Sequence, residues 1–218
     1  MDWQEYLDTT LEKYDGWRKQ GRLKNSSKVV PIQKSLAAKQ WVMPTEQVLL
    51  QLRGCRSYAL TDCACRTLAG KCDHPREVCF LINDAADLAV EKGKARRITL
   101  AQAEETMQRA EESGLVHLTL FNPSQHLFAI CNCCTCCCHD LVFLKQMGRS
   151  DLVVRSDYTA LTDMDLCTSC GECVERCPFE ARTMGEEGLV FDLEACFGCG
   201  LCVPVCPVEA TVMERREP

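Results

Sequence analysis

Eight cysteines near the C-terminus are spaced so that their thiols could hold metal. Two segments carry the pattern C-x2-C-x2-C-x3-C-P, and the second pattern begins 29 residues after the first. A cubane iron–sulfur cluster needs four thiolates. Three cysteines with two residues between each and the next can wrap one side of it in a tight loop. The spacing therefore predicts two [4Fe–4S] clusters. The cysteines are Cys167, Cys170, Cys173 and Cys177, then Cys196, Cys199, Cys202 and Cys206.

The fourth cysteine of each pattern lies on the turn that follows the loop, so we expect it to ligate the other cluster. The first predicted ligand set is Cys167, Cys170, Cys173 and Cys206. The second predicted ligand set is Cys196, Cys199, Cys202 and Cys177. A pair of zinc knuckles is the alternative, but it does not explain three successive cysteines two residues apart.

Residues 163–213 resemble the bacterial ferredoxins that hold two [4Fe–4S] clusters. All eight cysteines match, as do the prolines that follow each pattern, Pro178 and Pro207. The resemblance implies a compact pseudo-twofold fold with two small hairpins and two helical turns. It also implies transfer of single electrons at low potential. Backbone amides near Gly171, Gly198 and Gly200 are expected to hydrogen-bond the cluster sulfurs.

Eleven further cysteines precede this unit, and nine of them are candidate ligands of an additional metal site. We consider one or more extra iron–sulfur clusters, a zinc site and a redox-active dithiol, because clustered thiols suit each of these. A disulfide store is disfavoured in a reducing compartment. The nine candidates are Cys63, Cys65, Cys72, Cys79, Cys131, Cys133, Cys134, Cys137 and Cys138.

Three other residues lie beside these cysteines. Arg66 follows Cys65 and could either offset the charge of a cluster or form an ordinary salt bridge. His74 and His139 could be metal ligands or surface histidines. A cysteine-rich domain ahead of a ferredoxin unit resembles the arrangement in iron–sulfur proteins of anaerobic metabolism.

The spacing of apolar residues predicts an α+β chain whose N-terminal domain is mostly helical with one β-hairpin. Helices are expected over 1–15, 45–54, 83–93, 99–113 and 140–147. Thr99 and Gln102 form a capping box at the start of one of them. After Gly114 the apolar period changes to two, which indicates a hairpin with strands near 116–121 and 126–130. This helix–hairpin unit would bring the two cysteine-rich segments together.

A linker through Ser156 divides the chain into two predicted domains, residues 1–155 and 156–218, and the charge differs between the two ends of the chain. Residues 151–218 hold 14 acidic and 5 basic residues, a net charge of −9, whereas the rest of the chain carries +3. Residues 16–41 hold seven Lys or Arg and no acid. The acidic unit predicts a redox partner protein with a basic docking surface, and it disfavours nucleic acid as a partner.

The expected function is that of an iron–sulfur electron-transfer protein or subunit, relaying single low-potential electrons to or from an oxidoreductase. The alternatives are an iron–sulfur redox sensor or regulator, and a subunit of a cluster-dependent enzyme with an N-terminal metal site. No nucleotide-binding or nucleophile motif is present, which favours a carrier over a stand-alone catalyst. No apolar run is long enough to span a membrane, and no signal peptide follows Met1, so a cytoplasmic location is expected.

Overall fold

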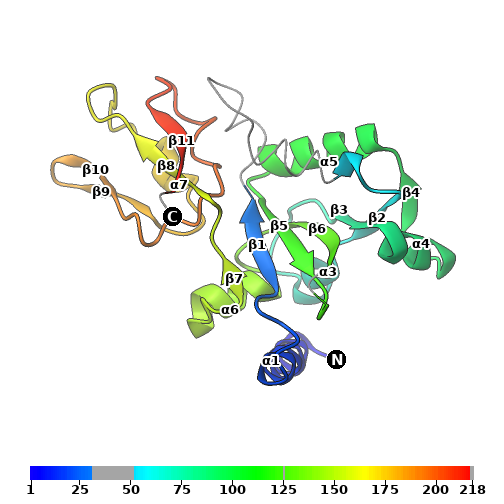
Figure 1. Ribbon diagram of the computed structural model, residues 1–218. Coiled ribbons are helices and arrows are strands. Elements are labelled where there is room, and N and C mark those ends of the chain that lie inside the picture. The colour runs from blue at the N-terminus through cyan, green and yellow to red at the C-terminus, as the bar shows by residue number, and fades with distance from the viewer. Residues whose placement is uncertain (31–51, 125, 217–218) are drawn as a thin grey trace.

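A computed structural model describes residues 1–30, 52–124 and 126–216 (Figure 1). Helices and strands are mixed along the N-terminal part of the chain. They are α1 (Trp3–Lys19), β1 (Ser27–Val30), β2 (Tyr58–Asp62), α3 (Ala64–Ala69), β3 (Glu77–Ile82), α4 (Asn83–Glu91), β4 (Arg96–Ile98), α5 (Leu100–Glu112), β5 (Val116–Phe121), β6 (Leu127–Cys133), α6 (His139–Met147) and β7 (Val153–Val154).

Seven of these strands form one mixed sheet in the order β4-β2-β3-β6-β5-β1-β7. Neighbouring strands are antiparallel, except that β1 and β7 are parallel. The prediction of a mostly helical domain with one β-hairpin is therefore wrong. The hairpin exists as β5–β6, but it is the middle of a larger sheet.

The missed strands lack the alternation of apolar and polar residues that marks a half-exposed strand. In β3, Val78, Phe80 and Ile82 are buried, and Cys79 between them is buried too. Such a strand, covered on both faces, is a continuous apolar run that periodicity does not separate from a helix. The edge strand β4 begins with two arginines, so its sequence carries no apolar alternation either.

Several local predictions are confirmed because short-range chemistry decides them. The capping box of α5 is present, with Thr99 and Gln102 each accepting a hydrogen bond from the other's backbone amide. Gly148 ends α6 in the left-handed conformation that glycine adopts without strain. Part of the helix predicted over 45–54 falls on residues outside the described ranges.

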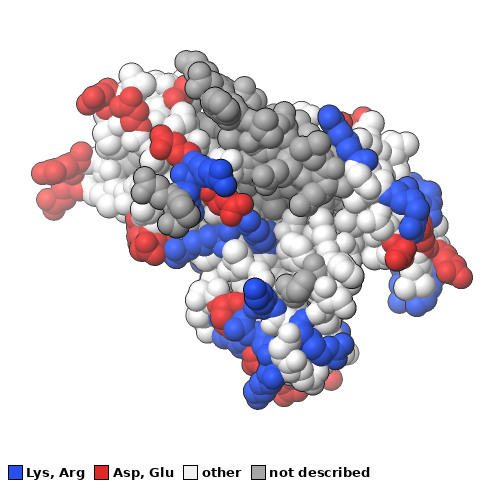
Figure 2. Space-filling model, viewed as in Figure 1, with Lys and Arg blue, Asp and Glu red and all other residues white. Residues whose placement is uncertain are grey.

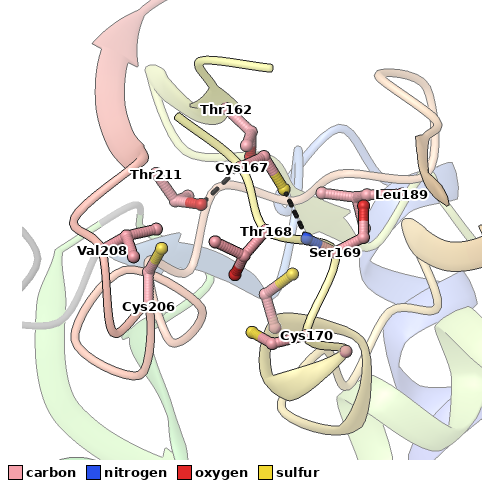
Figure 3. A pocket seen from close by; sticks show the side chains of 11 residues that line it. Thr162, Cys167, Thr168, Ser169, Cys170, Leu189, Cys206, Val208 and Thr211 are labelled. Atoms are coloured by element: carbon pink, nitrogen blue, oxygen red, sulfur yellow. Dashed lines mark hydrogen bonds between the residues drawn. The ribbon is translucent and has the colours of Figure 1, made fainter. Parts of the chain in front are cut away.

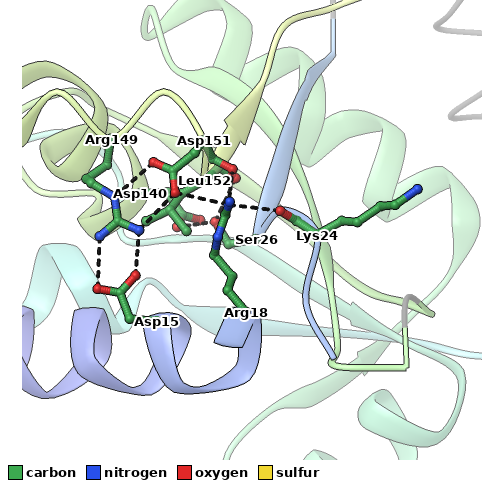
Figure 4. Close-up of polar contacts among 8 residues, drawn as sticks. All are labelled: Asp15, Arg18, Lys24, Ser26, Asp140, Arg149, Asp151 and Leu152. Atoms are coloured by element: carbon green, nitrogen blue, oxygen red, sulfur yellow. Dashed lines mark hydrogen bonds and ion pairs between the residues drawn. The ribbon is translucent and has the colours of Figure 1, made fainter. Parts of the chain in front are cut away.

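Helices cover both faces of the sheet. On one face α5 packs Ala103 and Met107 against Phe80 and Ile130. On the other face Leu7 of α1 and the apolar residues of α6 pack against β1 and β5. Ion pairs link α1 to the segment that follows α6. Arg149 binds both Asp15 of α1 and Asp151 (Figure 4). The same network includes Arg18, Lys24, Ser26, Asp140 and Leu152.

The C-terminal unit carries its own two small sheets. Strand β8 (Tyr158–Thr162) pairs antiparallel with β11 (Thr211–Arg215), and β9 (Arg182–Gly185) pairs with β10 (Gly188–Phe191). A single helical turn, α7 (Glu172–Glu175), follows β8 and precedes β9 in the chain. Under the 29-residue repeat β8 corresponds to β10 and β9 to β11, so each sheet joins one strand from each repeat.

Candidate functional site

Two neighbouring pockets in the C-terminal unit are lined by the predicted cluster ligands. The first has an empty volume of about 330 Å³, counting the space open to solvent, and is drawn in Figure 3. Its thiols come from the loop before and within α7 and from the turn before β11. They are those of Cys167, Cys170, Cys173 and Cys206, which is the first predicted ligand set.

The second pocket is nearly the same size, about 300 Å³. Its thiols are those of Cys177, Cys196, Cys199 and Cys202, so the fourth cysteine of each pattern faces the pocket of the other repeat. Two pockets of similar size, each with four thiols, fit two cofactors of one kind. That each set binds its own [4Fe–4S] cluster stays a prediction.

Hydrogen-bond donors approach these sulfurs, as metal-bound thiolates require. The backbone amides of Ser169 and Ala210 donate to Cys167 and Cys206 over 3.4 and 3.2 Å. In the second pocket the Thr159 hydroxyl donates to Cys196 over 3.4 Å. Burial raises the pKa of Cys202 to about 12. A buried thiol of this kind becomes a thiolate readily only when a metal offsets the charge.

One backbone position in the second pocket admits only glycine. Gly198 has φ +67°, and a Cβ there would lie 1.9 Å from the Tyr158 carbonyl oxygen. The equivalent residue of the first repeat, Ser169, has a similar φ of 53° and carries a side chain. The loops at Ser169 and Gly198 thus share a backbone conformation, but the loop at Gly198 lies in close contact with the backbone of β8.

Comparison with known proteins agrees with this geometry. Residues 166–210 match the family described as the 4Fe-4S dicluster domain, and none of the curated proteins matches the chain. The C-terminal segment is a ferredoxin-type iron–sulfur domain, and the chain accordingly has an iron–sulfur redox function. In the described part of the chain, no helix combines the length and apolar character needed to cross a bilayer.

Ten of the eleven cysteines of the N-terminal part form two groups. In the first, which we call the six-thiol group, Cys63 contacts Cys65 and Cys79. Contacts between sulfurs continue from Cys79 to Cys131 and on through β6 to α6. The hydrogen bond between Cys63 and Cys65 is the largest cause of two opposite shifts. It lowers the pKa of Cys63 and raises the pKa of Cys65. The members are Cys63, Cys65, Cys79, Cys131, Cys133 and Cys138.

The second, which we call the four-thiol group, consists of Cys72, Cys134, Cys136 and Cys137. Sequence reasoning omitted Cys136 from the candidates, because the run of six cysteines in eight residues gives no sign of which side chains turn inward. The expected meeting of the two cysteine-rich segments is confirmed, since Cys72 Sγ lies 3.7 Å from the sulfurs of Cys134 and Cys137. Which thiols would pair could not be predicted across about sixty residues. Cys55 belongs to neither group and accepts a hydrogen bond from Asn83.

His139 is a further residue of the site. It is 8% exposed, and its Nδ1 lies 3.0 Å from Cys65 Sγ. Tyr6 and Tyr14 of α1 hydrogen-bond its two ring nitrogens over 3.2 and 3.0 Å. His139 is thus a buried partner of the six-thiol group and not a surface histidine. The histidine and two tyrosines close the side of this group that faces α1.

Proposed function

We propose that this protein is an electron-transfer protein in which the ferredoxin-type domain exchanges electrons with a further redox centre in the six-thiol group. The observation that carries this proposal is one shared hydrophobic cluster. It contains Cys133 and Cys138 of the six-thiol group together with Phe179, Phe197 and Cys199, which line the second pocket.

Two aromatic rings belong to the same buried cluster as thiols of both sets. Phe179 and Phe197 stack with their centroids 4.8 Å apart, and both are buried. Leu141 and Phe143 of α6, which begins directly after Cys138, pack in the same cluster. Because these contacts are apolar and buried, the second pocket is the end of the domain that faces the other thiols.

The first pocket lies toward solvent. Cys170 is exposed, and so are Val208, which lines the pocket, and Met164 and Leu166, which precede Cys167 in the chain, at 40%, 54% and 56%. Exposed apolar residues rimmed by acids are typical of a surface that receives a partner protein. We infer that a redox partner docks here, with basic residues opposite Asp163, Asp165 and Glu172.

This arrangement gives electrons one site at which they enter the chain and a second site that receives them. When bound, iron–sulfur clusters of this class accept and release electrons one at a time. The partner would exchange an electron at the first pocket. The six-thiol group would hold the centre at the other end. Whether that centre is a further iron–sulfur cluster or a dithiol, it receives the electron inside the chain.

The test counts the electrons that the anaerobically purified full-length protein takes up in a reductive titration monitored by absorbance and electron paramagnetic resonance. We expect more than two per chain, because the two pockets account for one each. Replacing Cys133 and Cys138 together by Ser should lower the count to two and leave about eight irons in place.

Cys55→Ser is the matched control, since Cys55 lies outside both thiol groups, and it should leave the count unchanged. An uptake of two electrons by the unaltered protein would contradict the proposal. A double variant that kept the higher count would contradict it equally.

A further inference from the structure

The four-thiol group has the geometry of a site for one metal ion. All four sulfur atoms lie within 4.8 Å of one another. Cys134 and Cys137 are buried, and Cys72 and Cys136 are half-buried. We propose that Cys72, Cys134, Cys136 and Cys137 bind a single zinc ion with a structural role. The proposal does not depend on the electron-transfer function, because it concerns a different set of thiols.

The distances between the sulfurs favour a single ion over a cubane. Cys72 Sγ lies 3.7 Å from both Cys134 Sγ and Cys137 Sγ, and Cys136 Sγ lies 3.7 Å from Cys137 Sγ. A tetrahedron with Zn–S bonds of about 2.3 Å has edges of about 3.8 Å. In a cubane each thiolate binds a different iron, which holds the four sulfurs farther apart than this.

The surroundings favour thiolates at this place. Arg66 is fully buried, and its guanidinium donates to Cys134 Sγ over 3.5 Å. Its other hydrogen bonds go to the carbonyl oxygens of Pro75 and Asn132, which carry no formal charge. A buried arginine is stable only when a negative charge lies near it, and a zinc tetrathiolate has a net charge of −2.

Backbone amides support the same assignment. The amide of His74 donates to Cys72, and that of Lys71 donates to Cys137. Amide–sulfur bonds of this kind stabilise metal-bound thiolates and orient them. Binding would release four protons, one from each thiol, as Zn²⁺ takes their place.

The position of the group in the chain explains why an ion would be structural. Cys72 lies in the stretch between α3 and β3 that forms neither helix nor strand, and the other three lie in the turn between β6 and α6. Zinc would join two segments about sixty residues apart. Because the chain fills all four ligand positions, no place is left for a substrate, which distinguishes structural zinc from catalytic zinc.

The proposal is tested on the full-length protein by measuring zinc and iron per chain and by zinc-edge X-ray absorption. We expect one zinc per chain, surrounded by four sulfurs at about 2.3 Å. Cys136→Ser should lose this zinc or show three sulfurs and one lighter ligand, with the iron content unchanged. Cys55→Ser is the control and should keep both metals.

The absorption measurement on the unaltered protein decides the matter even if Cys136→Ser fails to fold. The proposal is overturned if the unaltered protein holds no zinc, if its zinc has fewer than four sulfur ligands, or if a single iron replaces it. A folded Cys136→Ser that keeps one zinc with four sulfurs would overturn the ligand assignment. The electron count proposed above could fail or succeed independently of each result.

Discussion

Arg182 breaks the symmetry of the two repeats at the place where their pockets meet. It is 2% exposed, and its guanidinium donates to Thr162 and to the carbonyl of Ala160 over 2.6 and 2.7 Å. The same group lies 3.9 Å from Cys173 Sγ of the first pocket and lines the second pocket. The equivalent residue in the second repeat is Thr211. A single buried cation therefore serves both ligand sets.

Replacing this arginine should make both clusters harder to reduce. Each cluster gains negative charge on reduction, so a nearby cation raises its reduction potential. Loss of the charge in Arg182→Gln is worth on the order of 2 kcal/mol at an effective dielectric constant of about 20, or a fall of roughly 80 mV. Redox titrations followed by electron paramagnetic resonance measure the shift. Arg182→Lys keeps the charge and should fall less, and equal potentials in all three proteins would exclude the electrostatic role.

Gly198 and Gly171 provide a matched pair for the backbone of the loops. Both have positive φ, but a Cβ on Gly171 meets nothing within 4 Å, whereas one on Gly198 would collide with Tyr158. Gly171→Ala should cost about 1 kcal/mol from its φ alone. Gly198→Ala should cost several kcal/mol more, because β8 must move. The measurement is iron per chain with the thermal midpoint of cluster loss, and equal losses in the two variants would contradict the steric argument.

Among the residues that the structure describes, the strands of the ferredoxin-type unit pair only with one another, although the unit also packs on the rest of the chain. Phe197 and Leu201 are buried against the residues of α6 and β7, and Lys145 of α6 donates to the Pro178 carbonyl over 2.9 Å. The unit is thus complete in its hydrogen-bonded strands but shares its apolar surface. Whether the unit folds without the rest of the chain therefore depends on the free energy of exposing that apolar surface to water.

A fragment from Ser156 to Pro218 should fold around two clusters with about eight irons, because both ligand sets and both sheets lie within it. It should lose its clusters at a lower temperature than the full chain, since exposing Phe197 and Leu201 costs on the order of a few kcal/mol. Iron analysis and thermal bleaching of the cluster absorbance test this. Four irons, or zinc in their place, would contradict the assignment of two clusters.

The charges of the whole molecule are unevenly distributed. On the face in Figure 2, acidic side chains gather at the outer end of the ferredoxin-type unit, and basic side chains lie mainly over the rest of the molecule. The turn between β9 and β10 contributes Glu186 and Glu187, and the next residue, Gly188, approaches Ser169 at the first pocket. The acidic surface therefore adjoins the pocket that faces solvent.

Electron exchange with a basic redox protein should consequently slow as salt rises, by roughly tenfold between ~0.05 and ~0.5 M, because exposed charges are screened beyond about 10 Å at 0.1 M. Stopped-flow mixing of the reduced protein with a basic one-electron acceptor gives the rate. Glu187→Lys should slow it severalfold, whereas Glu91→Lys at the end of α4, on the opposite side of the molecule in Figure 1, should have little effect. A rate independent of salt, or equal effects of the two substitutions, would refute electrostatic docking at this end.

Local patterns in the amino-acid sequence were enough to predict which of the eight C-terminal cysteines share a pocket, the capping box at Thr99 and the hairpin strands. That each set of four thiols binds a cluster stays a prediction. Each of these patterns depends on residues a few positions apart, or on a repeat that recurs along the chain, so spacing alone defines it. The seven-stranded sheet was not predictable in this way, since β3 is buried on both faces and carries no alternation. The meeting of the two cysteine-rich segments was expected, but the choice of Cys72 and Cys136 as members of one four-thiol group was not. The burial of His139 and the place of Arg182 between two pockets were not predictable either. These arise from contacts between residues far apart in the chain, which form when the sheet brings its strands together, and no local period records them.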